Sequence, residues 1–475
     1  VLEESGYLPR AAFLLDRLAQ ASYLIGCQRT REAIVIDPPR DITPILEGAR
    51  AEGVTITRVT ETHIHADFIS GSRELARATG AKLLLSGEGG DDWQYGFAAE
   101  DGATLLHDGD RITMGGVRLD VWHTPGHTPE HLAFIVTDVA RAEEPLAMVS
   151  GDFVFVGDVG RPDLLEKAAK VAGTMETSAR QLYASLQRLA ALPDHLQIWP
   201  GHGAGSACGK ALGAMPSSTL GYERRTNWAF AAANEAAFVT EVLAGQPAPP
   251  TYFATMKRLN RDGAPILGAR GALPGPGDGA ALLAARGAGT LLDVRSAREF
   301  GAGHVRGAVN IPMIKPFTTW SGWLFGYDVP IALIAPDAAA AETARKALAS
   351  IGLDQVTQWF GAAALADVAA GEGLTTSVHG DINGAETLMA DGRKVIDLRE
   401  IHEWNAGHIP GAQHQPLGTI RSGLATLDRD TPVAVHCHGG TRSAIGASVL
   451  EAMGFTDVVD LTAGISGWRG APSRD

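Results

Sequence analysis

The chain has 475 residues, of which 45% are apolar and 20% charged, as in a globular protein of two to four domains. Its formal net charge of -14 argues against nucleic acid as a partner, because nucleic-acid binding needs a basic surface. Three cysteines cannot build a disulfide framework, and no run of 18 apolar residues occurs. The first ten residues lack the basic region of a signal peptide. We therefore expect a cytoplasmic protein without a membrane partner.

Short apolar runs alternate with turn signals over residues 1–245. They predict strands that each end close to a histidine or an aspartate, since loops at strand ends can aim side chains from a rigid scaffold. Longer stretches between them, 163–192 and 224–243, predict helices. The predicted strands cover residues 33–37, 56–60, 147–149 and 198–199.

Four of the following loops carry residues that bind metals, each beside other polar or turn-forming residues. They are 62–68 (T-H-I-H-A-D-F), 124–128 (T-P-G-H-T), 150–152 (S-G-D) and 200–203 (P-G-H-G). A lone histidine usually has a structural role, but four such loops in order favour a metal centre.

The stretch 246–279 is rich in glycine and proline, which predicts a linker and no packed element. Beyond it the chain repeats itself. D-V-R at 293–295 returns as D-L-R at 397–399, 104 residues later, and G-H-V-R-G-A at 303–308 returns as G-H-I-P-G-A at 407–412. The repeat predicts two small parallel α/β domains, 280–372 and 373–475.

A cysteine loop in the second copy, V-H-C-H-G-G-T-R-S at 435–443, follows a predicted strand and precedes a predicted helix at 444–453. It resembles the active loop of rhodanese domains, C-x-x-G-x-R-S. Backbone N–H groups and a helix N-terminus would lower the thiol pKa of Cys437 and stabilise a persulfide on it. Arg442 would add positive charge or anchor the loop. The remaining candidate substrate contacts are His438, Gly439, Gly440, Thr441 and Ser443.

The first copy lacks this chemistry. Ala335 falls opposite Cys437 and Ala340 opposite Arg442, so we expect this copy to be a catalytically inactive rhodanese-like domain. His304 and His408 occupy equivalent Gly-His loops, where structural hydrogen bonds are expected.

The order of the metal loops resembles the metallo-β-lactamase superfamily, which implies an αββα sandwich for residues 1–245. The full motif of that family, H-x-H-x-D-H, supports two metal ions, but its last histidine is Phe68 here. The loss of a ligand puts a two-metal hydrolase of the glyoxalase II kind in doubt. Residues 157–164 and 200–210 resemble the subgroup of persulfide dioxygenases fused to rhodanese domains.

That resemblance implies a single Fe(II), with zinc as the alternative, held by His63, His127 and Asp152. Two histidines and one carboxylate leave open positions for O2 and a substrate sulfur. His65, Asp67 and His202 would then support the ligands or line the pocket. Arg161 would hold an anionic group of the thiol carrier unless it forms a structural ion pair, and Tyr222 would line the same pocket. Cys208 is either a buried apolar residue or a sulfur relay, and Cys27 belongs to the core.

The predicted activity is oxidation of a low-molecular-weight persulfide, of the glutathione or coenzyme A type, to sulfite and free thiol. Sulfur transfer through Cys437 would make or use thiosulfate, and the enzyme would be a homo-oligomer. One alternative is a zinc thioesterase of the glyoxalase II type with an appended sulfurtransferase. The other is a non-catalytic persulfide carrier or sensor with a structural metal, although structural sites usually have four ligands.

Overall fold

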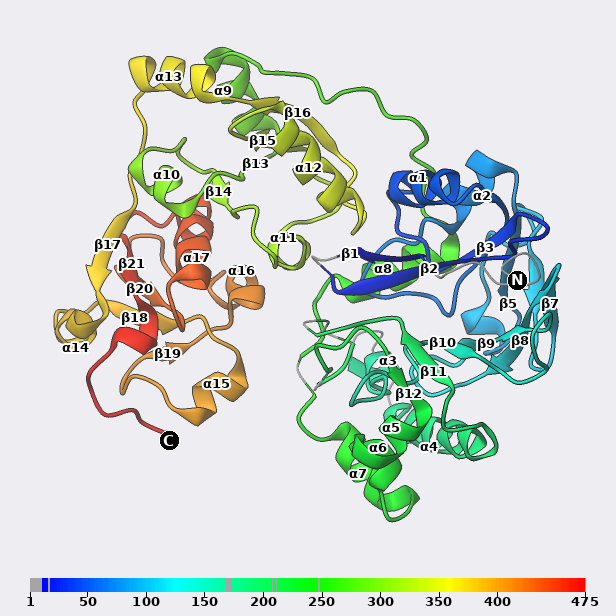
Figure 1. The fold of residues 1–475 in the computed structure, drawn as a ribbon. Coiled ribbons are helices and arrows are strands. Elements are labelled where there is room, and N and C mark those ends of the chain that lie inside the picture. The colour runs from blue at the N-terminus through cyan, green and yellow to red at the C-terminus, as the bar shows by residue number, and fades with distance from the viewer. Residues whose placement is uncertain are drawn as a thin grey trace. The chain divides into compact units, whose positions relative to one another are not determined.

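The structure, a computed structural model, describes residues 11–15, 18–167, 173–204, 206, 208–210, 212–246 and 248–474. The N-terminal ten residues, where no signal peptide is expected, lie outside this range. The chain forms two compact units. One comprises Val1–Arg270 with Ala349–Gly352, and the other comprises Gly271–Leu348 with Leu353–Asp475. Figure 1 shows the strands and helices of each unit.

The first unit contains two six-stranded sheets, each in sequential strand order. All four predicted strands are present. The first sheet has the order β1-β2-β3-β4-β5-β6 and consists of β1 (Ala11–Leu15), β2 (Gln20–Gly26), β3 (Glu32–Ile36), β4 (Thr55–Thr60), β5 (Lys82–Ser86) and β6 (Thr104–Leu106). The second has the order β12-β11-β10-β9-β8-β7 and consists of β7 (Arg111–Met114), β8 (Val117–His123), β9 (Leu132–Asp138), β10 (Ala147–Gly151), β11 (Gln197–Pro200) and β12 (Ser218–Thr219).

Apolar side chains from both sheets share one core, so the sheets pack face to face. Tyr23 and Ile36 of the first sheet lie in this core with Phe134, Val149 and Trp199 of the second. The outer face of each sheet has a core of its own against helices. This is the predicted αββα sandwich. Its helices are α1 (Thr43–Ala51), α2 (Ser72–Thr79), α3 (Leu164–Lys167), α4 (Met175–Arg188), α5 (Leu220–Thr226), α6 (Trp228–Ala231), α7 (Glu235–Leu243) and α8 (Phe253–Asp262).

The predicted helices at 163–192 and 224–243 are each interrupted. α3 and α4 occupy the first stretch, and residues 168–172 between them lie outside the described residues. α5, α6 and α7 share the second, because Asn227 and Asn234 each cap a new helix with the side-chain oxygen. Asparagine favours this position over the helix interior, where it competes for backbone hydrogen bonds.

Helix α8 corrects the prediction that 246–279 is a linker without a packed element. Phe253, Met256 and Asn260 of this helix are buried. The glycines and prolines that suggested a linker flank the helix, and Pro247 lies outside the described residues. The side chain of Asn260 donates to the backbone oxygens of His65 and Phe68, both at 2.7 Å. The supposed linker thus supports the metal loop.

We expect Asn260→Ala to lower the free energy of unfolding by about 3 kcal/mol, because it leaves buried backbone groups without partners. Asn260 also accepts from the backbone N–H of Ser70, at 2.9 Å. Denaturant unfolding at constant m-value measures the loss. Thr240→Ala, on the exposed side of α7, is the control and should change stability by less than about 0.5 kcal/mol. If Asn260→Ala lowers the free energy of unfolding by as little as the control does, then α8 does not stabilise the metal loop.

The second unit contains two parallel sheets, as the internal repeat predicts. The four-stranded sheet has the order β14-β13-β15-β16, and the five-stranded sheet has the order β17-β21-β20-β18-β19. The strands are β13 (Thr290–Asp293), β14 (Val309–Asn310), β15 (Ile331–Ile334), β16 (Val356–Phe360), β17 (Val378–Asp381), β18 (Lys394–Asp397), β19 (Gln413–His414), β20 (Val433–His436) and β21 (Val458–Thr462). The helices are α9 (Gly279–Ala288), α10 (Ala297–Ala302), α11 (Phe317–Leu324), α12 (Ala338–Ala349), α13 (Ala362–Gly371), α14 (Ala385–Ala390), α15 (Ile401–Ala406), α16 (Ile420–Gly423) and α17 (Thr441–Ala452).

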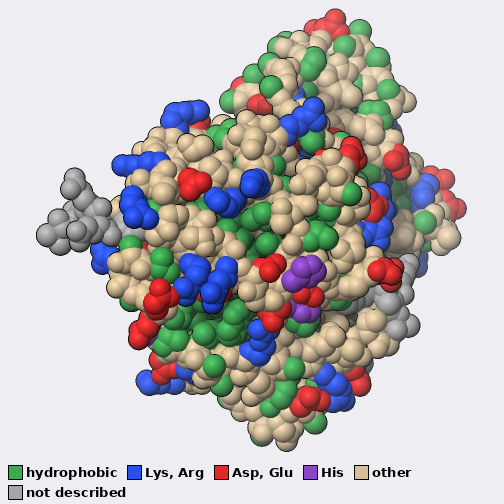
Figure 2. Space-filling model, turned by 90° about the vertical axis from the view of Figure 1, so that its right-hand side faces the viewer, with side chains coloured by type: hydrophobic (Ala, Val, Ile, Leu, Met, Phe, Trp, Pro, Cys, Tyr) green, Lys and Arg blue, Asp and Glu red, His purple; other side chains and the backbone are tan. Residues whose placement is uncertain are grey.

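No helix among the described residues is long and apolar enough to cross a bilayer. On the face shown in Figure 2, acidic and basic side chains are interspersed, and neither sign forms a continuous stripe.

Candidate metal centre and cysteine loop

The four metal loops meet because of the sheet topology. β3 pairs with β4 in parallel, as β10 does with β11, so the carboxyl ends of each pair point the same way. His63 follows β4, Asp152 follows β10 and His202 follows β11. His127 lies between β8 and β9.

His63, His127 and Asp152 form a buried group whose ligand atoms all lie within 4.8 Å of one another. Oδ2 of Asp152 is 3.9 Å from Nε2 of His63 and 3.4 Å from Nε2 of His127. The three residues are at most 2% exposed. The sequence predicted this trio as metal ligands, and the structure brings them together.

The donor atoms of this group are oriented for an ion. Nδ1 of His63 lies 2.9 Å from Oγ1 of Thr62, and Nδ1 of His127 lies 3.1 Å from the backbone oxygen of Arg161. Each ring is thus fixed through one nitrogen, with the other facing Asp152. No N–H or O–H group of the described residues donates to either carboxylate oxygen of Asp152. A buried carboxylate without a donor is costly, so this site fits a divalent cation.

His65, expected beside the ligands, lies with its ring centroid 4.2 Å from that of His63. Its Nε2 lies 3.0 Å from Oδ1 of Asp37. Burial would lower the pKa of His65, but the charge and hydrogen bond of Asp37 raise it to about 9. Nε2 of His65 is thus committed to Asp37, whereas its buried Nδ1 has no hydrogen-bond partner among the described residues.

Three supporting residues were missed from the sequence. Asp37 accepts from Thr62 through the backbone N–H at 2.6 Å and the hydroxyl at 2.8 Å. Glu130 accepts from the backbone N–H of Ile64 at 2.7 Å, and Nε2 of His131 accepts from that of Asp152 at 3.0 Å. Asp37 is the last residue of the predicted strand 33–37 and directly follows β3 in the structure, so its place at a strand end could have identified it.

We expect Asp37→Asn to weaken metal binding by about 10–100-fold, because it removes the charge that holds the loop around Thr62 and His65. Competition with a chelator of known affinity measures the change. Asp41→Asn alters a nearby carboxylate that accepts from the backbone N–H of Thr43 at 3.2 Å, and should leave the affinity unchanged. Equal metal affinities for the two variants would show that Asp37 does not support the metal site.

Asp67 and His202 form a second buried group with Cys208, whose ligand atoms also lie within 4.8 Å of one another. Phe68 is fully buried, with its ring 4.4 Å from that of His65. The second group therefore lacks the histidine that the family motif has at position 68. Residues 205 and 207 of the same loop lie outside the described residues.

The two predicted substrate contacts of this unit, Arg161 and Tyr222, differ in burial. Arg161 is fully buried and makes a two-point contact with Asp163, at 2.7 and 2.8 Å. This is the structural ion pair that the sequence left open as its alternative. Tyr222 lies on α5 and is 60% exposed. A substrate role for either residue stays a prediction.

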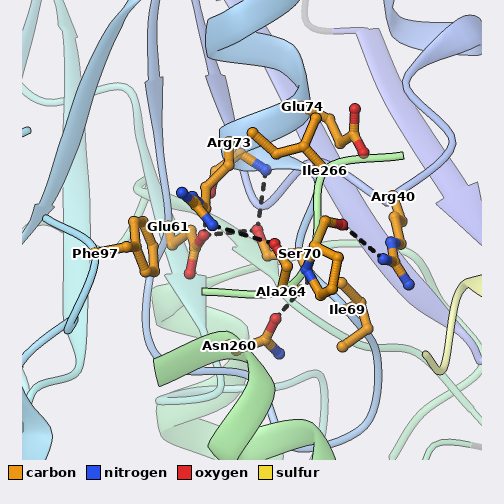
Figure 3. Close-up of a pocket in the computed structure, with 12 residues that line it drawn as sticks. Arg40, Glu61, Ile69, Ser70, Arg73, Glu74, Phe97, Asn260, Ala264 and Ile266 are labelled. Atoms are coloured by element: carbon orange, nitrogen blue, oxygen red, sulfur yellow. Dashed lines mark hydrogen bonds between the residues drawn. The ribbon is translucent and has the colours of Figure 1, made fainter. Parts of the chain in front are cut away.

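A small pocket lies beside the metal loop (Figure 3). Glu61, two residues before His63, faces it and accepts from the hydroxyls of Ser70 and Ser72. Asn260 of α8 also lines it. None of the metal-site residues does, so the pocket belongs to the support of the loop and not to the metal centre.

In the second unit, Cys437 follows β20 and its loop leads into α17. Its Sγ accepts from the backbone N–H of Gly440 at 3.1 Å. Gly440 has a φ of 98°, which a side chain would disfavour. Gly464 also approaches closely, since an added Cβ would lie 2.4 Å from the backbone oxygen of Cys437. The loop is closed around the sulfur and directs an N–H at it, as predicted.

The equivalent position after β15 is Ala335, followed by Asp337, which caps α12 through the N–H of Ala340 at 2.8 Å. This copy has neither thiol nor cation at those places. His304 and His408 each contact the backbone oxygen four residues earlier, at 3.0 and 3.2 Å. Both therefore have the structural role that was expected.

Arg442 does not stand free in the loop. Its guanidinium binds the carboxylate of Glu403 at two points, 2.5 and 2.8 Å. Burial would raise the pKa of Glu403, but Arg442 lowers it to about 2. Arg442 thus anchors the loop, one of the two roles that the sequence left open.

Because the folded-state pKa of Glu403 lies below its ordinary value of 4.5, the pair stabilises the protein above that pH and loses its effect toward pH 2. We expect Glu403→Gln to cost about 1 kcal/mol at pH 7, a value discounted for solvent screening. The cost should shrink steadily below pH 4.5. Urea unfolding from pH 7 to pH 3.5 measures it. Glu386→Gln, at an exposed position of α14 in the same domain, is the control, and a pH-independent difference between the two would refute the pairing.

Two stacked sheets flanked by helices, with a buried His-His-Asp group at one edge, define a metal-dependent enzyme fold. A family model of the metallo-beta-lactamase superfamily matches residues 15–202, and a model of the rhodanese-like domain matches 278–358 and 382–471. A metallo-beta-lactamase from Staphylococcus aureus subsp. aureus COL is 41% identical, with a TM-score of 0.67. The similarity covers 75% of this chain and 99% of that one. The chain belongs to the metallo-beta-lactamase superfamily and carries two rhodanese-like domains.

Two further relatives are similar to the first unit. A hydroxyacylglutathione hydrolase from Synechococcus sp. is 32% identical over 180 residues, which make up 38% of this chain and 63% of that protein. The chain thus spans less than two thirds of the length of that relative. The structure of ETHE1 from Myxococcus xanthus is 25% identical with a TM-score of 0.44, covering 54% of this chain and 98% of that one.

Proposed function

We propose that the first unit uses iron to oxidise a low-molecular-weight thiol persulfide, and that the rhodanese-like domain with Cys437 transfers sulfane sulfur. In the balanced reaction a persulfide, O2 and water give a thiol, sulfite and two protons. The observation that carries this proposal is the combination, in one chain, of a two-histidine, one-carboxylate group with a cysteine loop built to hold a persulfide.

His63, His127 and Asp152 would hold the ion on one side and leave its other positions open. Iron bound there would supply the capacity to activate O2. Thr62 and the backbone oxygen of Arg161 keep the two rings turned toward the ion. Asp37 would fix the ring of His65 beside the ligands through Nε2. All three ligands are buried, so their donor atoms are shielded from bulk water.

In the second unit, the N–H of Gly440 and the N-terminus of α17 would stabilise negative charge on Cys437. The Cys437 thiolate attacks the outer sulfur of a donor, the donor leaves as thiol or sulfite, and Cys437 becomes a persulfide. An acceptor thiol or sulfite then attacks that outer sulfur and restores the thiolate. Thiosulfate is the product with sulfite as acceptor and the donor in the reverse direction.

Anaerobic reconstitution with Fe(II), followed by addition of glutathione persulfide or coenzyme A persulfide, tests the first half. We expect stoichiometric O2 consumption and sulfite formation. The same protein loaded with zinc should consume no O2. No O2 consumption by the iron form with either persulfide would overturn the proposal.

A zinc thioesterase of the glyoxalase II type is the second candidate. It is favoured by the similarity to the hydroxyacylglutathione hydrolase and by the retention of Asp67 and His202 beside the metal trio. Two zinc ions per chain, with hydrolysis of a glutathione thioester and no oxidation of persulfide, would establish it in place of the oxygenase.

A further inference from the structure

Asp460 is a buried carboxylate that the sulfur transfer at Cys437 leaves unused. It lies on β21, which pairs with β17 on one side and on the other with β20, the strand that leads to Cys437. Asp460 is 4% exposed, and its Oδ1 has no hydrogen-bond partner among the described residues. A buried carboxylate oxygen without a donor costs free energy, so its place beside the cysteine loop points to a function.

Two polar side chains act on this carboxylate. Oδ2 of Asp460 lies 3.6 Å from Nδ1 of His379, which is paired with Asp460 across β17 and β21 and is about half exposed. The other is the hydroxyl of Ser443, in the first turn of α17. Burial raises the pKa of Asp460, and the Ser443 hydroxyl and His379 oppose this effect.

Ser443 also contacts the reacting sulfur. Sγ of Cys437 lies 3.8 Å from Oγ of Ser443, within reach of a hydrogen bond from a thiol. The hydroxyl donates to the backbone oxygen of Gly440 at 3.0 Å, and rotation about its C–O bond turns the same hydrogen toward Asp460. A continuous path of polar groups thus leads from the buried sulfur through Ser443 and Asp460 to the half-exposed His379.

On the basis of the sulfur transfer proposed above, we propose that Asp460 takes the thiol proton of Cys437 through the hydroxyl of Ser443, and that His379 passes it to solvent. The proton on Sγ moves to Oγ of Ser443 while the hydroxyl proton of Ser443 moves to the carboxylate of Asp460. The electron pair of the S–H bond stays on sulfur, so Cys437 becomes the thiolate that attacks the donor, and no oxidant or reductant takes part. Ser443 is a catalytic residue because it contacts the sulfur, whereas Asp460 and His379 act through it.

The other charged groups around the loop are engaged elsewhere. The guanidinium of Arg442 binds Glu403, which lowers the pKa of Glu403 to about 2 and makes it a poor proton acceptor at neutral pH. Nε2 of His436 lies 3.8 Å from Asp397, on the neighbouring strand β18. Burial makes the carboxylate of Asp460 a stronger base by raising its pKa, which suits a group that accepts a proton.

Asp460→Asn in the full chain tests the relay through sulfur transfer from thiosulfate to cyanide, measured from about pH 6 to about pH 9. We expect kcat to fall about 100-fold at pH 7, the usual scale of general acid–base catalysis. Hydroxide then has to remove the proton, so the rate of the variant should rise about tenfold per pH unit, whereas that of the unaltered protein should change little. Disturbed packing alone would lower the rate by the same factor at every pH.

Ser443→Ala provides a second variant of the same path, in case Asp460→Asn disturbs folding, and should show the same loss and the same pH dependence. The double variant should lose no more than either single variant, because both interrupt one path. Asp391→Asn, at an exposed position of the same domain, is the control and should keep the rate. An unaltered rate or a pH-independent loss in Asp460→Asn, or losses that multiply in the double variant, would overturn the relay.

Alkylation of Cys437 by iodoacetamide separates the relay from the proposed function, since it requires the thiolate but no sulfur donor. Mass spectrometry of the Cys437 peptide should show slower alkylation in Asp460→Asn at pH 7 and recovery at higher pH. Equal alkylation rates in the variant and the unaltered protein would overturn the relay. Slow alkylation in the variant, in a protein that transfers no sulfur even when unaltered, would support the relay and count against the proposed function alone.

Discussion

We expect Asp152→Asn to lower the metal content of the site below about a tenth of the unaltered value and to abolish the proposed persulfide oxidation. Loss of a residue that merely orients a ligand costs 10–100-fold in affinity, and a ligand should cost more. Asp152 is fully buried, and its carboxylate supplies the negative charge that faces His63 and His127. Asparagine retains the shape without that charge. Metal analysis after dialysis against a weak chelator, together with O2 consumption, measures both effects.

Asp138→Asn is the matched control for this variant. Asp138 is another aspartate of low exposure, 8%, but it ends β9 and pairs with Arg141. It should retain the metal and the activity. Full metal content in Asp152→Asn would show that the ion is held elsewhere, and full activity without metal would contradict a metal-dependent reaction altogether.

The metal trio could be predicted because its signal is local. Each ligand stands in a short loop directly after a strand, and parallel strands bring such loops to one edge of a sheet. The same reasoning extends to Asp37, which follows β3. The orientation of His65 could not be read in this way. His63 and His65 are two residues apart, but the direction of the second ring depends on Asp37, 28 residues earlier.

The other features that the sequence did not predict depend on contacts between distant segments of the chain. Asn260 reaches the metal loop from α8, more than 190 residues beyond it, and the glycines and prolines around α8 suggested a linker. Arg442 was recognised from its motif, but its partner Glu403 belongs to a helix 39 residues earlier. The repeat was a stronger guide, because equivalent strands place Ala335 and Cys437 at equivalent positions. Sequence patterns therefore predicted the metal ligands and the cysteine loop. They did not predict the distant residues that hold these groups in position.

We expect Cys437→Ser to abolish the proposed sulfur transfer, while the persulfide oxidation proposed for the first unit continues. Removal of the nucleophile from a covalent catalyst can cost on the order of 10⁶ in rate, so transfer from thiosulfate to cyanide should fall below detection. Serine keeps the loop closed, because the N–H of Gly440 can still donate to an oxygen. Cyanide-dependent thiocyanate formation and O2 consumption, measured on the same preparation, separate the two activities.

The internal repeat supplies a stringent comparison. Ala335→Cys introduces a thiol at the equivalent position of the first copy, where Ala340 replaces the arginine and Asp337 caps the following helix. We expect it to gain no sulfur transfer when combined with Cys437→Ser, because a thiol without the surrounding donors is not stabilised as a thiolate. Activity restored by Ala335→Cys would show that the thiol alone suffices. Activity retained by Cys437→Ser itself would remove the cysteine loop from the mechanism, and with it the main reason to regard a persulfide as the substrate of the metal centre.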